Sequence, residues 1–152
     1  MKRYGVLSGI LLLVLFASPT TAFAAGDLSR QTPVELRVQL GDEKGVRRFF
    51  PEKLELETGK LYRLIFSNPS PEMHYFSSDA LSQAVFTRKV QVNGPDGKPL
   101  AEIKGSIREI EVYPKASTEW WFIPIKTGQF TDLKCTVQGH TEAGMVGQII
   151  VK

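Results

Sequence analysis

The chain has 152 residues, of which 42% are hydrophobic and 23% charged, a balance typical of a globular protein with a buried core. This length suits one domain, and the composition excludes disordered, collagen-like and coiled-coil chains. The net charge is +3, but Lys2 and Arg3 lie in a segment that resembles a leader, so the remainder carries 17 − 16 = +1. The charge therefore does not indicate nucleic-acid binding.

The N-terminal segment has the three-part layout of a secretory signal peptide. A basic start (Met1–Arg3) precedes an apolar run (Val6–Ala17) and the small-x-small sequence Ala22–Ala24. A membrane anchor is the alternative, but the apolar run is shorter than the roughly 20 residues that a spanning helix needs. We therefore expect residues 1–24 to be cleaved. Residues 25–152 would form an exported domain, periplasmic or secreted, with no membrane span after cleavage.

The rest of the chain has the pattern of short strands. Val34–Leu40 alternates apolar and polar residues, as expected for a strand with one solvent-exposed face. Asn68–Pro71 cannot continue a strand ladder because proline lacks the amide donor. A short helix is expected at about Asp79–Val85, and a hairpin turn at Asn93–Gly97. Further strands are expected at Leu61–Phe66, Arg88–Val92, Leu100–Ile103, Ile107–Val112, Thr118–Ile125, Gln129–Cys135 and Gly147–Val151.

These elements predict an all-β fold. Seven or eight short strands within residues 25–152 suggest a two-sheet Greek-key sandwich. The aromatic segment Trp120–Phe122 is expected to contribute to the core and to a sheet face. An aromatic binding platform is the alternative for this segment.

Three side chains that can bind a metal lie on one predicted loop between the last two strands. Cys135, His140 and Met145 are separated by four residues in each case. A loop that joins adjacent strands at one end of a sandwich can direct all three toward a common point. His74 follows the proline-rich break, so we expect it on a loop as well, at the same end.

This set of side chains favours copper. Cys135 is the only cysteine, so an intrachain disulfide is excluded, and a lone thiol in an exported protein pairs between chains, is buried or binds something. Structural zinc sites use more thiolates or histidines, and calcium and magnesium prefer oxygen. Two imidazoles, a thiolate and a long axial thioether form the blue-copper arrangement. The alternatives are a metal-free interaction domain with a buried thiol, and a cysteine hydrolase, for which no orienting carboxamide or oxyanion motif is visible.

The loop resembles the copper-binding loop of the cupredoxins, the small blue-copper proteins. Cys135–His140 is similar to the start of the azurin loop, and His140–Val151 is similar to the plastocyanin ending, in which a glycine and the final strand come after the methionine. The two equal gaps resemble rusticyanin. The segment from Phe50 to Asn68 resembles the approach to the first histidine ligand. The resemblance implies one type 1 copper per chain, with His74, Cys135 and His140 as equatorial ligands and Met145 as the axial ligand.

Three features depart from the family pattern. Many cupredoxins have an asparagine after the first histidine, which hydrogen-bonds the residue after the cysteine. Tyr75 stands there in this chain, so Thr136 is expected to lack that partner. The separation of 135 − 74 = 61 residues is long, so we expect Ser77–Ser106 to form an extra hairpin or flap. Met73 is an alternative thioether, ranked below Met145 because neighbours on an extended segment point to opposite sides.

The resemblance implies an electron carrier and not an enzyme. We expect a soluble monomer that exchanges single electrons with a redox partner such as a cytochrome, through a small and transient interface. The electron would leave through His140 and an apolar patch around it, for which the candidates are Pro69, Pro71, Ala143 and Val146. The alternative is a copper-binding or copper-delivery protein of the periplasm without a dedicated electron-transfer role.

Overall fold

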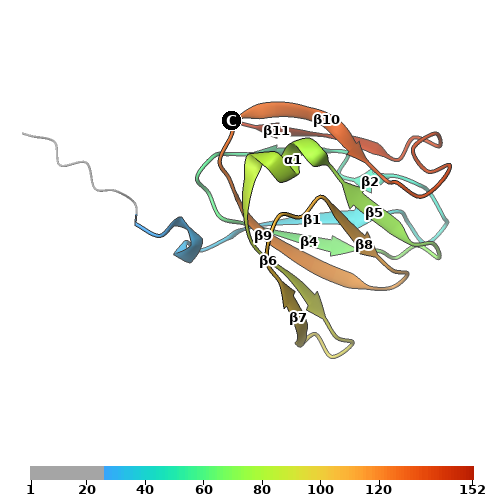
Figure 1. Ribbon diagram of the computed structural model, residues 1–152. Coiled ribbons are helices and arrows are strands. Elements are labelled where there is room, and N and C mark those ends of the chain that lie inside the picture. The colour runs from blue at the N-terminus through green and yellow to red at the C-terminus, as the bar shows by residue number, and fades with distance from the viewer. Residues whose placement is uncertain (1–25) are drawn as a thin grey trace, which may run out of the picture.

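The protein is a β-sandwich, seen here in a computed structural model that describes residues 26–152. Two sheets pack face to face over one hydrophobic core (Figure 1). The predicted all-β, two-sheet Greek-key architecture is confirmed. The predicted signal peptide lies outside the described residues. Among residues 26–152, no helix has both the length and the apolar character needed to cross a membrane.

The larger sheet has six strands. Strands β1 and β4 run parallel, and the other neighbours are antiparallel. In spatial order the strands are β2 (Phe49–Phe50), β1 (Val34–Leu40), β4 (Tyr62–Ser67), β9 (Ser117–Pro124), β6 (Val85–Asn93) and β7 (Pro99–Ile103).

The smaller sheet has five strands and includes the strands on either side of Cys135 and Met145. Strands β3 and β11 run parallel, and the other neighbours are antiparallel. The spatial order is β3 (Lys53–Leu56), β11 (Val146–Val151), β10 (Gly128–Lys134), β5 (His74–Ser77) and β8 (Glu109–Val112). Two short helical segments complete the described residues: η1 (Leu28–Arg30) and α1 (Asp79–Ala84).

The region between the first histidine and the cysteine contains the expected extra structure. Helix α1 begins after Ser78, whose hydroxyl accepts a hydrogen bond from the amide of Leu81 as an N-cap. Strands β6 and β7 then form the predicted hairpin, which projects from the body of the sandwich (Figure 1). Its turn is closed by the amide of Gly94, which donates to the carbonyl of Lys98 at 2.8 Å.

Strand β5 was not expected from the sequence, and it changes the environment of His74. The sequence predicts His74 on a loop, whereas the structure places it as the first residue of β5. Burial alternates along this strand, with His74 and Phe76 buried and Tyr75 and Ser77 half-buried. Because strand side chains alternate between faces, His74 points into the sandwich beside Phe76. The first histidine is therefore fixed by the sheet itself.

Aromatic side chains fill the core next to β5. The ring of Phe76 lies 4.8 Å from that of Phe66 and 5.8 Å from that of Phe49, measured between centroids. Trp120 and Phe122 are also buried, as expected. Trp121 faces outward from the same strand and lies against the cationic groups of Arg63, Arg88 and Lys89.

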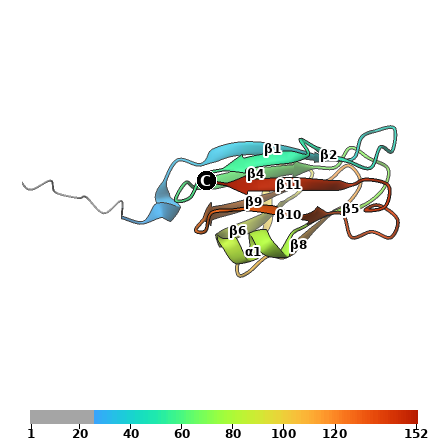
Figure 2. The ribbon, with the colours of Figure 1, turned by 90° about the horizontal axis from the view of Figure 1, so that it is seen from above.

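Three loops gather at one end of the sandwich. They are residues 41–48 between β1 and β2, residues 68–73 between β4 and β5, and residues 135–145 between β10 and β11. Both views place them at the end opposite the C-terminus (Figure 1; Figure 2). This end brings the candidate metal-binding residues together.

Candidate metal centre

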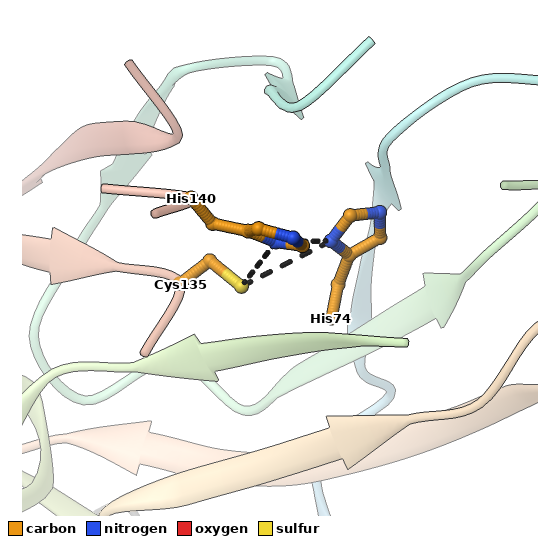
Figure 3. A group of neighbouring side chains, drawn as sticks. All are labelled: His74, Cys135 and His140. Carbon is orange, nitrogen blue, oxygen red and sulfur yellow. Dashed lines mark hydrogen bonds between the residues drawn. The ribbon is translucent and has the colours of Figure 1, made fainter. Parts of the chain in front are cut away.

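His74, Cys135 and His140 form one buried cluster, although Cys135 lies 61 positions after His74 in the sequence. The Nδ1 atoms of the two histidines lie 3.2 Å apart. The sulfur of Cys135 lies 3.4 Å from Nδ1 of His140 and 3.9 Å from Nδ1 of His74. Figure 3 shows these three atoms facing a common point. The sequence-based expectation that these side chains converge agrees with this arrangement.

The spacing of these atoms fits a first-row transition metal. Bonds of about 2.0 Å to nitrogen and 2.3 Å to sulfur, at tetrahedral to trigonal angles, place neighbouring donor atoms roughly 3.3–3.7 Å apart. The three measured separations lie between 3.2 and 3.9 Å. One thiolate and two imidazoles are ligands that suit copper. The cluster therefore has both the donor chemistry and the size for a copper ion.

The outer nitrogen of His74 is held by a serine in the loop before β5. Nε2 of His74 lies 3.0 Å from Oγ of Ser70. The Ser70 hydroxyl donates its own hydrogen to the carbonyl of Glu72 and accepts the amide of Glu72. Since its hydrogen is already used, Ser70 accepts a hydrogen bond from Nε2–H of His74. The Nδ1 atom of His74 is then left as a lone pair that faces the cluster.

A buried asparagine holds this loop in place. The side-chain amide of Asn68 donates to the carbonyls of Glu72 and Val112, each at 2.8 Å. Its side-chain oxygen accepts the amide of Ser70 at 2.9 Å. Asn68 therefore ties the loop to the end of β8, the strand that pairs with β5. The loop cannot shift without breaking several buried hydrogen bonds, so Ser70 stays fixed against His74.

Gly41 forms the wall behind His74. Its φ of +68° is a left-handed conformation that favours glycine. A Cβ atom at this position would lie 2.5 Å from Nε2 of His74 and 2.9 Å from Cβ of Ser70. The absence of a side chain at residue 41 therefore lets the imidazole reach its place.

His140 is oriented by its own loop. Gly139, with a φ of +81°, precedes it in the left-handed conformation. The amide of His140 donates to the carbonyl of Val137, and its carbonyl accepts the amide of Met145. The outer nitrogen Nε2 lies 3.4 Å from a carboxylate oxygen of Glu72. The ring is only 3% exposed, so a carboxylate covers the outer nitrogen of this histidine.

Burial keeps both imidazoles neutral. Desolvation, followed by the proximity of His140, lowers the pKa of His74 to about 4. Desolvation, followed by the charge of Arg47, also lowers the pKa of His140. Glu72 remains ionised beside them because its hydrogen bonds from Arg47 lower its pKa. A neutral imidazole is the form that binds a metal, so both rings are in that form at neutral pH.

The sulfur of Cys135 is placed where the sheet opens. Cys135 follows the last residue of β10, and its amide donates to the carbonyl of Met145. The sulfur accepts the main-chain amide of Tyr75 at 3.3 Å. Burial raises the pKa of the Cys135 thiol, while the amides of Tyr75 and Val137 oppose that shift. A cation at the cluster would supply the charge that such a buried thiolate needs.

The residue after the cysteine has a partner that the sequence did not indicate. The hydroxyl of Thr136 donates to a carboxylate oxygen of Glu109 at 2.6 Å. Thr136 therefore lacks the asparagine partner, as expected, and bonds a carboxylate that the sequence did not identify. Tyr75 occupies the position where an asparagine was expected, and Glu109 on strand β8 bonds Thr136 instead.

The two candidate methionines differ in burial. Met145 is completely buried, and its main chain is hydrogen-bonded to both Cys135 and His140. Met73 is 41% exposed, although it is adjacent to His74. The ranking of Met145 above Met73 as the axial thioether stays a prediction.

Sequence reasoning missed three residues that shape this centre. Ser70, Glu72 and Gly41 contact the histidines, but no motif identifies them. The available signal for Ser70 and Glu72 was their position in the proline-rich segment directly before His74. For Gly41 it was a glycine directly after the first alternating strand.

The fold is similar to that of copper-protein domains in solved structures. The chain is 18% identical to a copper-containing nitrite reductase from Thermus scotoductus, with a TM-score of 0.59, covering 82% of this chain and 32% of that one. It is 16% identical to the McoA multicopper oxidase from Aquifex aeolicus, with a TM-score of 0.57, covering 89% of this chain and 32% of that one. A plastocyanin from Dryopteris crassirhizoma is 19% identical, with a TM-score of 0.42, covering 77% of this chain and 100% of that one.

The similarities to the two enzymes show the fold and not the role. The chain spans about a third of the length of the two enzymes. No protein-family model and no curated protein sequence matches the chain. The protein has the cupredoxin fold, as the resemblance in the metal-binding loop implied. The buried His74–Cys135–His140 cluster has the donor atoms and the spacing of a copper site.

Proposed function

We propose that the protein is an exported type 1 copper protein that carries single electrons between redox partners. The observation that carries this proposal is the buried cluster of one sulfur and two Nδ1 atoms at the loop end of a cupredoxin fold. His74, Cys135 and His140 would hold one copper ion per chain, with Met145 as the axial ligand. A bound copper ion would supply a one-electron couple between copper(II) and copper(I).

The contribution of the chain is to hold the ligands nearly still. His74 lies on a sheet strand, is bonded to Ser70 and lies against Gly41. The main-chain amide of Cys135 donates a hydrogen bond to the carbonyl of Met145. Complete burial of His74, Cys135 and Met145 also excludes water from the centre. Ligands that move little between two oxidation states lower the reorganisation needed for electron exchange, which supports a carrier role.

The surface around the centre supports docking with a partner. Of the expected patch, Pro71, Ala143 and Val146 are exposed, and Pro69 is half-buried. Met73 adds an exposed thioether next to the first histidine. We propose that this small apolar surface receives a redox protein such as a cytochrome in a short-lived complex, with the carrier itself a monomer.

The alternative function is copper capture or delivery without a dedicated redox partner. A delivery protein has to release copper readily, which an exposed site would favour. The three candidate equatorial ligands are between 0% and 3% exposed. Their burial therefore favours electron transfer over copper delivery.

Rapid mixing distinguishes the two functions. The copper(I) protein, mixed with oxidised cytochrome c, is expected to pass one electron per chain to the haem iron, leaving copper(II) protein and ferrous cytochrome. Stopped-flow absorption at the haem and thiolate bands would show both changes with one rate. Transfer of copper to a chelator that outpaces any haem reduction would instead support copper delivery.

The axial position can be tested with a matched pair of substitutions. Met145→Leu is expected to keep copper and its visible colour but to raise the reduction potential by roughly 60 mV, a tenfold change in relative affinity for the two copper states, because the weak axial ligand tunes the potential. Met73→Leu is the control and should leave the potential unchanged. Voltammetry of both variants measures the effect. If Met73→Leu shifts the potential and Met145→Leu does not, Met145 is not the axial ligand.

A further inference from the structure

An ion pair covers the outer side of His140. Nε and Nη2 of Arg47 donate to the two carboxylate oxygens of Glu72, each at 2.9 Å. One of those oxygens also lies 3.4 Å from Nε2 of His140. The side chains of Arg47 and Glu72 are 37% and 40% exposed, whereas that of His140 is 3% exposed. The outer nitrogen of this histidine therefore faces a charged group and not open solvent.

Glu72 is fixed at both its main chain and its side chain. Its carbonyl accepts from Asn68 and Ser70, and its amide donates to the Ser70 hydroxyl. Its carboxylate is gripped by the planar guanidinium of Arg47 through two parallel hydrogen bonds, the most directional form of such a pair. Most surface ion pairs lack this double restraint. The carboxylate is thus held at a defined place beside the ring.

The pair joins the three loops that form the metal end. Arg47 lies in the loop between β1 and β2, Glu72 in the loop between β4 and β5, and His140 in the loop between β10 and β11. The first histidine receives support from the same short segment, because Ser70 binds Nε2 of His74. Residues 70 and 72 therefore each face the outer nitrogen of one histidine.

A carboxylate in this place has two physical effects. An ionised carboxylate can only accept hydrogen bonds. It therefore favours the tautomer of His140 with a proton on Nε2 and a lone pair on Nδ1, which faces the cluster. Its negative charge stabilises the more positive of two metal states. Partners of this kind at the outer nitrogen of a metal-bound histidine orient the ring and raise its basicity. The positive charge of Arg47 opposes the second effect.

We propose that Glu72, held by Arg47, is a positioning residue of the metal centre that orients His140 and lowers the reduction potential of bound copper. This inference rests on the proposed copper-binding function. The Arg47–Glu72 ion pair thereby has a role in setting the reduction potential of copper, in addition to joining two surface loops.

The test is the reduction potential of Glu72→Gln, measured by redox titration of the thiolate-to-copper band. Glutamine keeps the shape and removes the charge, so the affinity for copper(II) relative to copper(I) is expected to fall about tenfold, which raises the potential by about 59 mV. Glu52→Gln is the matched control, because Glu52 forms an exposed pair with Arg48 in the same region. The control should leave the potential unchanged.

Arg47→Gln provides the opposite change. It leaves the Glu72 charge without its partner, so the potential is expected to fall. Loosening of the loops alone would move both variants in one direction. Opposite shifts with an unchanged Glu52→Gln support the inference. Equal shifts, shifts in one direction, or no shift beyond the control overturn it. A wild-type protein that shows no thiolate-to-copper band would instead overturn the proposed copper function.

Discussion

Replacing Cys135 with serine is expected to abolish the intense visible absorption of the copper(II)-loaded protein. Such a band arises from charge transfer between a thiolate sulfur and copper, and Cys135 is the only cysteine in the chain. Its sulfur faces both Nδ1 atoms at 3.4 and 3.9 Å. Serine keeps the shape of the side chain but removes the soft ligand that copper prefers. Absorption and spin-resonance spectra before and after the substitution measure the effect.

The wild-type spectrum decides what the substitution means. A copper(II)-loaded wild-type protein should be blue or green, and Cys135→Ser should lose the colour while keeping its β-sheet circular dichroism. A colourless wild-type protein that binds zinc tightly would contradict the redox function. An intense band that survives in the serine variant would show that the sulfur of Cys135 is not a ligand.

Saturating copper(II) is expected to raise the melting temperature strongly. The three clustered candidate ligands extend from residue 74 to residue 140 and come together only in the folded chain. A metal that binds the folded state alone stabilises it by about 4 kcal/mol at a thousandfold excess over Kd. For a domain of this size, that free energy corresponds to a rise of roughly 15 °C. Differential scanning calorimetry with and without copper measures it.

The serine variant also serves as the control for this measurement. Cys135→Ser should lose most of the rise, since it keeps the fold and removes one of the three strong ligands. An unchanged melting temperature of the wild-type protein at saturating copper would contradict a preformed site in the folded state.

The sequence predicted the long strands better than the short ones. Val34–Leu40 alternates over seven residues, and the structure has a strand with the same bounds. Strand β5 has four residues and begins with a histidine, so its buried face lacks the apolar alternation that signals a strand. Strand β2 has two residues and is followed at once by Pro51. Such short strands form because neighbouring strands pair with them, and this information is not local.

The same distinction applies to the metal centre. Cys135 and His140 are close in sequence, and their residue types alone indicate a metal. Gly41, Ser70 and Glu72 act through shape, hydrogen bonds and charge, which depend on how three loops meet. Thr136 shows the limit most directly, because its partner Glu109 is 27 residues away on β8, which β5 separates from β10. The donor atoms could thus be predicted, whereas the groups that orient them could not.

The hydrogen bond to the sulfur of Cys135 comes from the main chain of Tyr75 and not from a side chain. In the ladder between β5 and β10, only Ser77 and Lys134 are paired, so the thiol serves as the acceptor just beyond the point where the two strands separate. Only a proline at position 75 would remove the main-chain N–H, so every other substitution there keeps this hydrogen-bond donor. The side chain at position 75 is not needed for this hydrogen bond. Position 75 can therefore be substituted to engineer the centre without removing the donor to the sulfur.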